Sequence, residues 1–277
     1  MNNEFYYNKK KILENWIKIK FRLHLNFYRR FNTLIKDQYK DFRRIPILII
    51  SFNQLHYLKG LIDFLDKHDY RNIIIIDNNS TYKPLREYLA SIEHRITVYR
   101  LPENYGHNVV FKRKDLFDKY LKGYYVITDS DVVPIKECPP DFLKFFKDIL
   151  DQNSKVRKVG FGLKIDDIPD SNPQKHNILK RQSKFWDKDK KTAEGYYAEI
   201  DTTFALYRPK SFNFLPVPYF SGIRTTFPYL AHHGGWYIDP KKLTSEQEYY
   251  LKTSNNSGSW KLNDDGSLEN KKFPGLK

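Results

Sequence analysis

Two carboxylates that stand one residue apart are the strongest chemical signal in this chain. Asp129 and Asp131 follow the apolar and aromatic run 124–127, which has the length and composition of a buried strand. Side chains two residues apart on an extended backbone point the same way, so both acids can converge beyond the strand end. Convergent carboxylates repel unless a cation lies between them, and Mg²⁺ or Mn²⁺ bridging to substrate phosphates meets this need. The alternative is a solvated turn in which one acid caps the next segment.

Composition limits the classes of protein and of partner. The 277 residues, 40% of them apolar, are enough for one large domain or two small ones. The net charge of +15 favours anionic partners, namely nucleotide phosphates, acidic glycans, an anionic membrane surface or nucleic acid. Cys138 is the single cysteine, which excludes a disulfide framework and a Cys-based zinc site. No run reaches the length of a membrane span and no signal peptide is visible, so we expect a cytoplasmic protein.

The first 44 residues form a basic extension, with 12 Lys and Arg against 4 Asp and Glu. We expect an amphipathic helix here, although residues 17–27 alternate strictly between apolar and polar, which is a strand signature. A basic amphipathic helix can lie in a membrane interface, which would make the protein peripheral on the inner face of a membrane. Alternatively, the helix packs on the next domain and shows its basic face to water. The residues that can share one helical face are Leu13, Trp16, Ile17, Leu23, Phe27, Phe31, Leu34 and Ile35.

Strand and helix patterns alternate from Ile45 onward, which predicts an α/β fold with a doubly wound, mostly parallel sheet. Residues 45–251 would form one domain. Residues 252–277 read as a polar C-terminal tail. The expected strands are 45–52, 72–76, 96–101, 124–127, 158–163 and 196–207; the expected helices are 55–67, 85–91, 106–121 and 142–150, and 166–191 reads as a long polar loop or lid.

Taken in order, four motifs resemble the GT-A glycosyltransferases, and among them the bacterial family-2-like enzymes. They are Ser-Phe-Asn at 51–53, Ile-Ile-Asp-Asn-Asn-Ser at 75–80, Asn-x-Gly at 104–106 and the Asp-Ser-Asp of 129–131, and the resemblance covers about 45–240. It implies a GT-A (Rossmann-like) mixed sheet, with a nucleotide-binding half at 45–135 and an acceptor-binding half at 136–251. It also implies that the first two strand ends hold base and ribose and that Asp-x-Asp binds a divalent metal, Mn²⁺ or Mg²⁺. The implied nucleotide-binding residues are Ser51, Asn53, Asp77, Asn104, Gly106, Asp129 and Ser130.

The resemblance also implies a general base and a further metal ligand. In the family, an acid in the region of Glu199 and Asp201 removes the proton from the acceptor hydroxyl; we expect Asp201 to do so, with Glu199 as the second choice. A histidine shortly before Trp-Tyr matches His233, which would join Asp129 and Asp131 as a metal ligand. Arg224 can pair with a diphosphate and Trp236 can stack on a sugar ring. The ordinary alternative for Glu199 and Asp201 is an acidic strand edge. For Arg224 it is a surface arginine, and for Trp236 a core aromatic residue.

These features predict a metal-dependent glycosyltransferase. It would move a sugar from a nucleotide-diphosphate-sugar, with UDP favoured, to a hydroxyl of a glycan or lipid-linked acceptor, with inversion, in polysaccharide or surface glycan biosynthesis. A sugar-phosphate nucleotidyltransferase shares the layout, but the loop 51–57 lacks the glycines and arginine that such enzymes normally show. A basic nucleic-acid-binding protein is the alternative of another class, and it leaves the later motifs unexplained.

Overall fold

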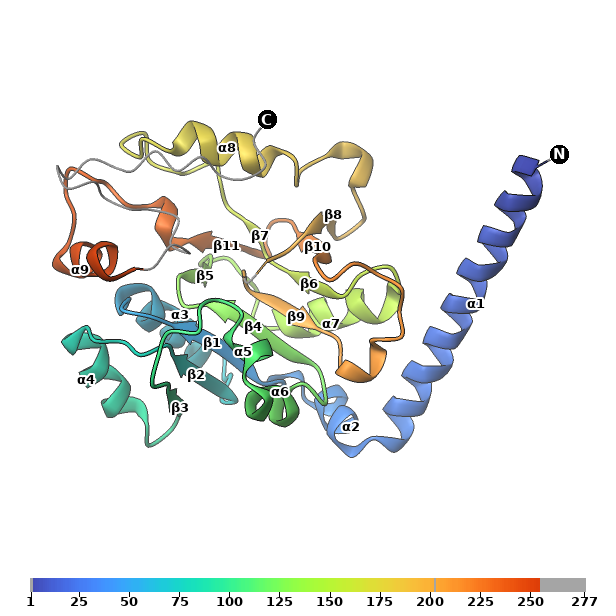
Figure 1. Cartoon of the computed structure of the whole chain (residues 1–277), viewed down its shortest axis with the longest axis horizontal. Helices are drawn as coiled ribbons and strands as arrows, with labels where there is room; N and C mark the ends of the chain where they lie inside the picture. Colours follow the sequence, from blue (N-terminus) through green and yellow to red (C-terminus); the bar gives the residue numbers. More distant parts are fainter. Residues whose placement is uncertain (1, 202, 255–277) are drawn as a thin grey trace.

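The computed structural model describes residues 2–201 and 203–254. Within these residues, a mixed eight-stranded sheet lies between helices, and a three-stranded sheet adjoins it (Figure 1). The strand order is β3-β2-β1-β4-β9-β6-β10-β8 in the large sheet and β5-β11-β7 in the small one. The strands are β1 Ile47–Ser51, β2 Ile73–Asp77, β3 Thr97–Arg100, β4 Tyr125–Asp129, β5 Val132–Pro134, β6 Lys158–Gly160, β7 Gly162–Leu163, β8 Gly195–Glu199, β9 Ala205–Tyr207, β10 Ser221–Thr225 and β11 Leu230–His233.

Helices cover both faces of the large sheet. The α-helices are α1 Asn2–Phe31, α2 Thr33–Lys40, α3 His56–Lys67, α4 Lys83–Ile92, α5 Val109–Lys112, α6 Lys114–Tyr120, α7 Phe142–Gln152, α8 Lys175–Ser183 and α9 Ser245–Thr253. Ile47 and Ile49 pack with α3, α4 and α7 on one face, whereas Leu48 and Ile50 pack with α5 and α6 on the other. Strands covered on both faces read as continuous apolar runs, and β1 and β2 are buried throughout.

The two halves of the large sheet differ in strand direction. Strands β3, β2, β1 and β4 run parallel, while β9 is antiparallel to both β4 and β6. Beyond them, β10 runs parallel to β6, and β8 is antiparallel to β10. The predicted α/β class with a doubly wound, mixed and mostly parallel sheet is therefore confirmed.

Four expected elements differ from the structure. The expected helix 106–121 is two helices, since Arg113 is extended between α5 and α6. The expected strand 158–163 is β6 and β7, which belong to different sheets. The expected strand 196–207 is β8 and β9, with Asp201 between them. The expected loop 166–191 contains α8, which buries Ile178 and Gln182.

The basic extension is helical, as expected. The strand that the alternation of residues 17–27 would indicate is not formed. Figure 1 shows α1 at the edge of the molecule, with its N-terminal end pointing away from the sheets. Its other end joins α2, which packs beside the start of β4. The domain division at residues 44/45 and 251/252 stays a prediction. Helix α9 runs past the second boundary, and the predicted tail beyond residue 254 lies outside the described residues.

The buried side chain of Gln38 holds α2 to β4. Its amide nitrogen donates to the carbonyl oxygen of Tyr124 at 2.8 Å, and its amide oxygen accepts from the Tyr124 N–H at 2.9 Å. A Cβ atom at Gly123 would lie 2.6 Å from the Gln38 oxygen, so only glycine leaves room for this contact. The extension is thus joined to the domain by a buried pair of hydrogen bonds.

We expect Gln38→Ala to lower the free energy of unfolding by about 2–3 kcal/mol, because it leaves two buried backbone groups of Tyr124 unpaired. Urea denaturation measures this change. The exposed Lys36 on the same helix supplies the control, and Lys36→Ala should change stability by less than about 0.5 kcal/mol. Equal effects of the two substitutions would show that the Gln38 contact contributes nothing specific.

Candidate active site

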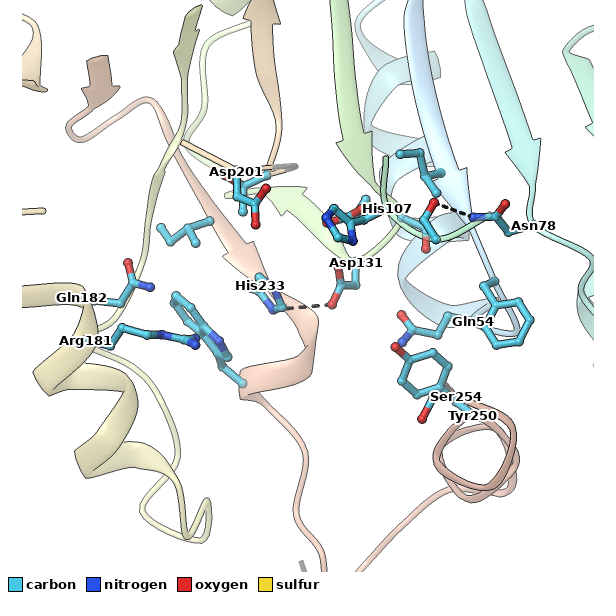
Figure 2. A pocket seen from close by; sticks show the side chains of 18 of the residues that line it. Gln54, Asn78, His107, Asp131, Arg181, Gln182, Asp201, His233, Tyr250 and Ser254 are labelled. Atoms are coloured by element: carbon cyan, nitrogen blue, oxygen red, sulfur yellow. Dashed lines mark hydrogen bonds and ion pairs between the residues drawn. The ribbon is translucent and has the colours of Figure 1, made fainter. Parts of the chain in front are cut away.

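A cavity of about 450 Å³ lies where β1, β2 and β4 end, which is the edge at which open α/β sheets bind ligands. Its volume is in the range of small-molecule sites. Figure 2 shows Asp131, His233 and Asp201 between the side chains of α8 and those near β1, β2 and α9. The lining residues are Ile50, Phe52, Gln54, Asn78, Asn104, Gly106, His107, Asp129, Ser130, Asp131, Leu163, Arg181, Gln182, Lys184, Phe185, Asp201, Thr203, Arg224, His233, Trp236, Tyr250 and Ser254.

The Asp-Ser-Asp segment turns at the end of the central strand. Asp129 is the last residue of β4, and Ser130 and Asp131 form the turn into β5. The amide of Ser130 donates to the carbonyl of Ile50 at 3.0 Å, which fixes the turn against β1. Both acids line the cavity, although the backbone between them is a turn and not the extended run that the spacing predicts.

Strand pairing brings His233 to Asp131 across a hundred residues of sequence. In the small sheet His233 pairs with Val132, the neighbour of Asp131, and Gly234 N–H donates to the Asp131 carbonyl at 2.7 Å. His233 Nδ1 lies 3.4 Å from Asp131 Oδ2, and the His233 ring stacks on Trp236 with centroids 4.9 Å apart. The pair in Figure 2 is therefore set by backbone contacts of β5 and β11.

The donor atoms around Asp131 fit a cation that shares its coordination with a ligand. His233 Nδ1 is buried and makes no hydrogen bond within the described structure, although it faces the carboxylate. Among the described residues, no three His, Cys, Asp or Glu side chains converge closely enough to hold a metal by themselves. Mg²⁺ sites on phosphates commonly use one or two carboxylates, with phosphate and water oxygens completing the shell. This arrangement fits a metal held jointly with a diphosphate.

The acids Asp201 and Glu199 do not share a side, in contrast to the prediction from their spacing. Asp201 lies in the connection from β8 to β9 and lines the cavity. Glu199 ends β8, is exposed, and does not line the cavity. Its backbone carbonyl accepts from Arg224 Nε at 2.9 Å. The backbone change between the two acids separates them, so Asp201 alone of the pair is placed for chemistry in this cavity.

Arg224 is built into the wall beside Asp201. It is buried on β10, where Nη1 donates to Gln182 Oε1 at 3.3 Å and Cζ lies 3.9 Å from the centroid of the Phe185 ring. Burial lowers the pKa of Arg224 to about 10, so it stays protonated at neutral pH. Arg224 is thus no surface arginine. It joins β8 to α8 while lining the cavity, and Trp236, also buried, lines it beneath His233.

Three predicted nucleotide-binding side chains do not line the cavity. Asn53 Oδ1 accepts from the amides of Thr81 and Tyr82 at 2.8 and 3.0 Å. Asp77 Oδ1 accepts from the Ser80 amide at 3.0 Å, and Ser51 is fully buried, with no hydrogen-bond partner for Oγ in the described structure. The carboxylate and amide shape the turns after β1 and β2, which was the ordinary alternative for such residues.

Asn104 and Gly106 do line the cavity, but their roles differ from the prediction of a helix start. Gly106 has φ of 76°, which glycine adopts without strain. Its amide donates to Asn104 Oδ1 at 2.9 Å, so it is not a vacant helix-end donor. Asn78 fastens this loop, because its side chain donates to the Gly106 carbonyl at 3.1 Å and accepts from the Tyr105 amide at 3.3 Å.

Several lining residues escaped the sequence analysis. Arg181, Gln182 and Lys184 come from α8 or follow it, in the segment expected to be a loop. The signal was present, since the apolar pairs 178–179 and 185–186 stand seven residues apart, as on one helical face. Asn78 was also missed, although it follows Asp77 within the motif at 75–80. The missed residues that no local pattern marks include Gln54, His107, Tyr250 and Ser254.

The acids influence the tyrosines around them. Burial first, and then the charges of Asp131 and Asp129, raise the pKa of Tyr250. Burial and the charge of Asp131 also raise the pKa of Tyr57 to about 12; its hydroxyl donates to the Gly234 carbonyl at 2.9 Å. Both hydroxyls therefore remain protonated donors at any pH near neutrality.

A buried lysine lies beneath the Asp201 loop. Lys158 is fully buried on β6, where Nζ donates to Tyr207 Oη at 3.1 Å and to the Asp201 carbonyl at 3.5 Å. The rings of Tyr207, Tyr219 and Phe220 surround it, with centroids 4.7, 4.8 and 5.4 Å from Nζ. Burial lowers the pKa of Lys158 to about 7, which the charge of Asp201 opposes and that of Arg224 reinforces.

This shift predicts a pH-dependent contribution to stability. Between about pH 7 and pH 10 the unfolded chain keeps a proton on Lys158 that the folded chain releases, so the free energy of unfolding rises with pH. We expect Lys158→Met to be more stable than the parent at pH 6, by about 2 kcal/mol, and to lose this advantage by about pH 9.5. Urea denaturation at several pH values measures the difference.

The exposed Lys155 is the matched control, and Lys155→Met should give a stability difference that does not vary with pH. A constant difference between Lys158→Met and the parent from pH 6 to pH 9.5 would show that Lys158 does not change protonation on folding.

Three solved structures are distantly similar to this chain. The mannosyltransferase PcManGT from Pyrobaculum calidifontis, described in complex with GDP-Man and Mn²⁺, is 15% identical, over 68% of this chain and 55% of that chain, with a TM-score of 0.35. S. aureus TarS 1-349 is 17% identical, over 60% and 47%, with a TM-score of 0.39. A cytidylyltransferase from Leptospira borgpetersenii is 10% identical, over 61% of each chain, with a TM-score of 0.34.

These structural likenesses are distant, and the chain spans between 47% and 61% of the length of the three structures. A search of curated proteins found no match. The decisive finding is a sequence match between residues 47–215, more than half of the chain, and the model of one family, described as glycosyl transferase family 2. The chain belongs to glycosyl transferase family 2, and its mixed α/β sheet is the GT-A fold that the motifs predict.

Proposed function

We propose that the cavity transfers a sugar from a nucleotide-diphosphate-sugar to an acceptor hydroxyl. The observation that carries this proposal is the meeting of Asp129, Asp131 and Asp201 in one cavity at the carboxyl edge of the parallel strands. The first two acids suit a diphosphate with its metal, and the third is free of that turn and suits a general base. Family membership supports sugar transfer from nucleotide sugars in general; the details below are proposals.

The donor lies with its base toward β1 and β2 and its diphosphate toward Asp131. Polar groups on the β1 and β2 side are Gln54, Asn78 and the Asn104–Gly106 loop, which can meet a base or ribose with hydrogen bonds. UDP is the favoured nucleotide. Tyr250, whose hydroxyl stays protonated, lines the same region and can donate to a phosphate oxygen.

Asp131 and His233, with Asp129 at the end of β4, would hold Mn²⁺ or Mg²⁺ jointly with the diphosphate, whose oxygens would complete the coordination. When bound, such an ion neutralises the negative charge that develops on the departing diphosphate. The chain's own contribution is the geometry described above, in which β5 and β11 hold the carboxylate and the imidazole face to face. Arg224 adds a permanent positive charge to the same cavity.

Asp201 acts as the base. Its carboxylate accepts the proton of the acceptor hydroxyl as that oxygen bonds to the anomeric carbon, while the bond from this carbon to the diphosphate oxygen breaks and the nucleoside diphosphate departs with the electron pair. Attack from the face opposite the diphosphate inverts the anomeric configuration. The Lys158 contact to the Asp201 carbonyl holds the loop that carries the base.

The acceptor is a hydroxyl of a glycan or of a lipid-linked glycan, and the product belongs to polysaccharide or surface glycan synthesis. We propose a peripheral location on the inner face of a membrane, and the exposed apolar residues of α1 support the membrane contact. No helix in the described residues combines the length and apolarity that crossing a bilayer requires.

We expect Asp201→Asn to reduce the release of UDP from UDP-sugars by about 10²–10⁴-fold, because the amide cannot accept the proton. The assay uses water as acceptor and a panel of UDP-sugars with Mn²⁺. UDP affinity, measured by calorimetry, should change by less than about threefold, since Asp201 lies on the acceptor side.

Glu199→Gln supplies the matched control, because Glu199 is two residues away and outside the cavity. It should retain activity within about threefold. Full activity of Asp201→Asn, or a loss of activity confined to Glu199→Gln, would show that Asp201 is not the general base. The proposed function itself would be contradicted if both variants still bind UDP but the parent releases UDP from none of the nucleotide sugars tested.

The adjacent histidines test the metal site. We expect His233→Asn to raise the Mn²⁺ concentration for half-maximal UDP binding by about tenfold, because one ligand of the shared metal is lost. His232→Asn should leave it unchanged, since His232 Nε2 faces Asp167 Oδ2 at 3.1 Å instead of the cavity. Mn²⁺ titration with calorimetric detection of UDP binding distinguishes them. An equal shift in both variants would indicate a loss of local structure and not of a ligand.

A further inference from the structure

Helix α1 has two apolar faces, and only one of them is covered by the protein. Phe21 and Leu25 are buried against Phe212 and Leu215, and the Phe21 and Phe212 rings meet edge to face at 5.8 Å. Arg208 also stacks over the Phe21 ring at 4.7 Å. This inner face anchors the C-terminal half of α1 to the domain.

The other face of α1 is exposed, and we call it the outer face. Its six large side chains follow spacings of three and four residues and are each 50–66% exposed, so they share one stripe along the helix. Single exposed apolar residues are ordinary, but a continuous stripe of them marks an interaction surface. The outer face consists of Ile12, Trp16, Ile19, Leu23, Phe27 and Phe31.

The two faces explain the alternation of residues 17–27. Successive odd residues in this run are 200° apart on a helix, so they fall in turn on the inner face and on the outer face. Phe21 and Leu25 are buried, while Ile19, Leu23 and Phe27 are exposed. The alternation is therefore a property of a helix that must be apolar on opposite sides, which is needed only when both sides meet an apolar medium.

Cations border the outer face. Lys11, Lys18, Arg22 and Arg29 are exposed and fall on one edge of it, at spacings of seven, four and seven residues. From Lys9 to Phe31 the sequence contains one acid, Glu14, which by its spacing from Phe21 lies on the inner side. The outer face thus combines large apolar and aromatic groups with positive charge and no negative charge.

We propose that the outer face of α1 lies in the interface of an anionic membrane. Helices that bind in this plane bury an apolar stripe that includes Trp, Phe and Leu, and they place Lys and Arg beside lipid headgroups. A second copy of the chain fits less well, because pairing two outer faces would bring their bordering cations together without acids to balance them. The proposal deepens the peripheral location proposed above, rests on the surface of α1, and does not depend on the sugar-transfer chemistry.

The membrane would cover α1 on the side away from the sheets. The inner face holds α1 to the domain through Phe212 and Leu215, so the outer face is turned outward on the opposite side of the same helix. The domain does not need to open for the contact to form. Binding should accordingly require neither donor nor acceptor.

The test is cosedimentation of the full chain with vesicles, without nucleotide sugar. We expect binding to phosphatidylcholine vesicles that contain phosphatidylglycerol, and at least about tenfold weaker partition to pure phosphatidylcholine. Leu23→Asn plus Phe27→Asn should weaken partition to anionic vesicles by about tenfold or more, because two large apolar side chains no longer enter the interface.

A charge variant separates the roles of apolar and positive groups. Lys18→Glu plus Arg22→Glu should also weaken binding to anionic vesicles at least tenfold and should make the remaining binding less sensitive to salt. Lys83→Glu plus Lys114→Glu is the control with equal net charge, since both lysines are highly exposed on other helices. This control should retain partition within about threefold.

The substituted side chains are exposed, so thermal unfolding of all variants should match the parent. Three results would overturn the proposal: no partition of the parent to anionic vesicles, equal losses in the α1 variant and its charge control, or a dimer in light scattering that Leu23→Asn plus Phe27→Asn dissociates while vesicle binding is absent. UDP release by the parent is measured separately, so a failure here is distinct from failure of the sugar-transfer proposal.

Discussion

The repulsion between carboxylates in one cavity is the constraint on which this structure depends. Asp129, Asp131 and Asp201 line the same space, and like charges that share a cavity disfavour one another unless positive groups or donors stabilise them. The Gly235 amide donates to Asp131 Oδ2 at 3.3 Å, and Arg224 brings a buried positive charge to the wall beside Asp201. The field in the cavity is therefore uneven, with Asp129 and Asp131 at the strand ends and Arg224 on the side of α8. A diphosphate that arrives with a divalent ion matches both parts of this field, which is why the proposed donor suits the site.

The site is assembled by contacts that are remote in sequence. The parallel half of the sheet supplies the turn at 129–131, but the His233 that faces it arrives through the pairing of β5 with β11. Gly234 is required at this junction because a Cβ atom there would lie 2.5 Å from the Tyr57 ring. The histidine position thus depends on α3 through Tyr57 as well as on the small sheet. A change far from the cavity on either element can therefore alter the position of His233 relative to Asp131 without touching either residue.

Local sequence patterns predicted the elements whose structure depends on residues close together in the sequence. The parallel strands and their helices were predicted because buried strands are continuous apolar runs and the helices have a clear apolar face. The cavity contains Asp129, Asp131, Asp201 and His233, as the motifs indicated. The predictions failed at positions where contacts with distant segments determine the structure. The Asp77 carboxylate accepts a hydrogen bond within its own turn, while its neighbour Asn78 lines the cavity. Because residues 196–207 form two strands, Glu199 lies outside the cavity. No pattern within a few residues distinguishes these neighbours, because the distinction is made by the strand or loop that each one meets.

Helix α1 shows that a failed pattern can still carry information. Strict alternation favours a strand because a strand has two faces, and a helix normally has one apolar side. When the structure makes such a segment helical, the alternation implies two apolar sides on opposite edges. The domain covers one of them, with Phe21 and Leu25. Leaving the other in water would be unfavourable by the same hydrophobic effect that buries the first. A bordering row of cations favours the proposed medium, because an anionic bilayer offers negative charge along its whole plane beside an apolar interior.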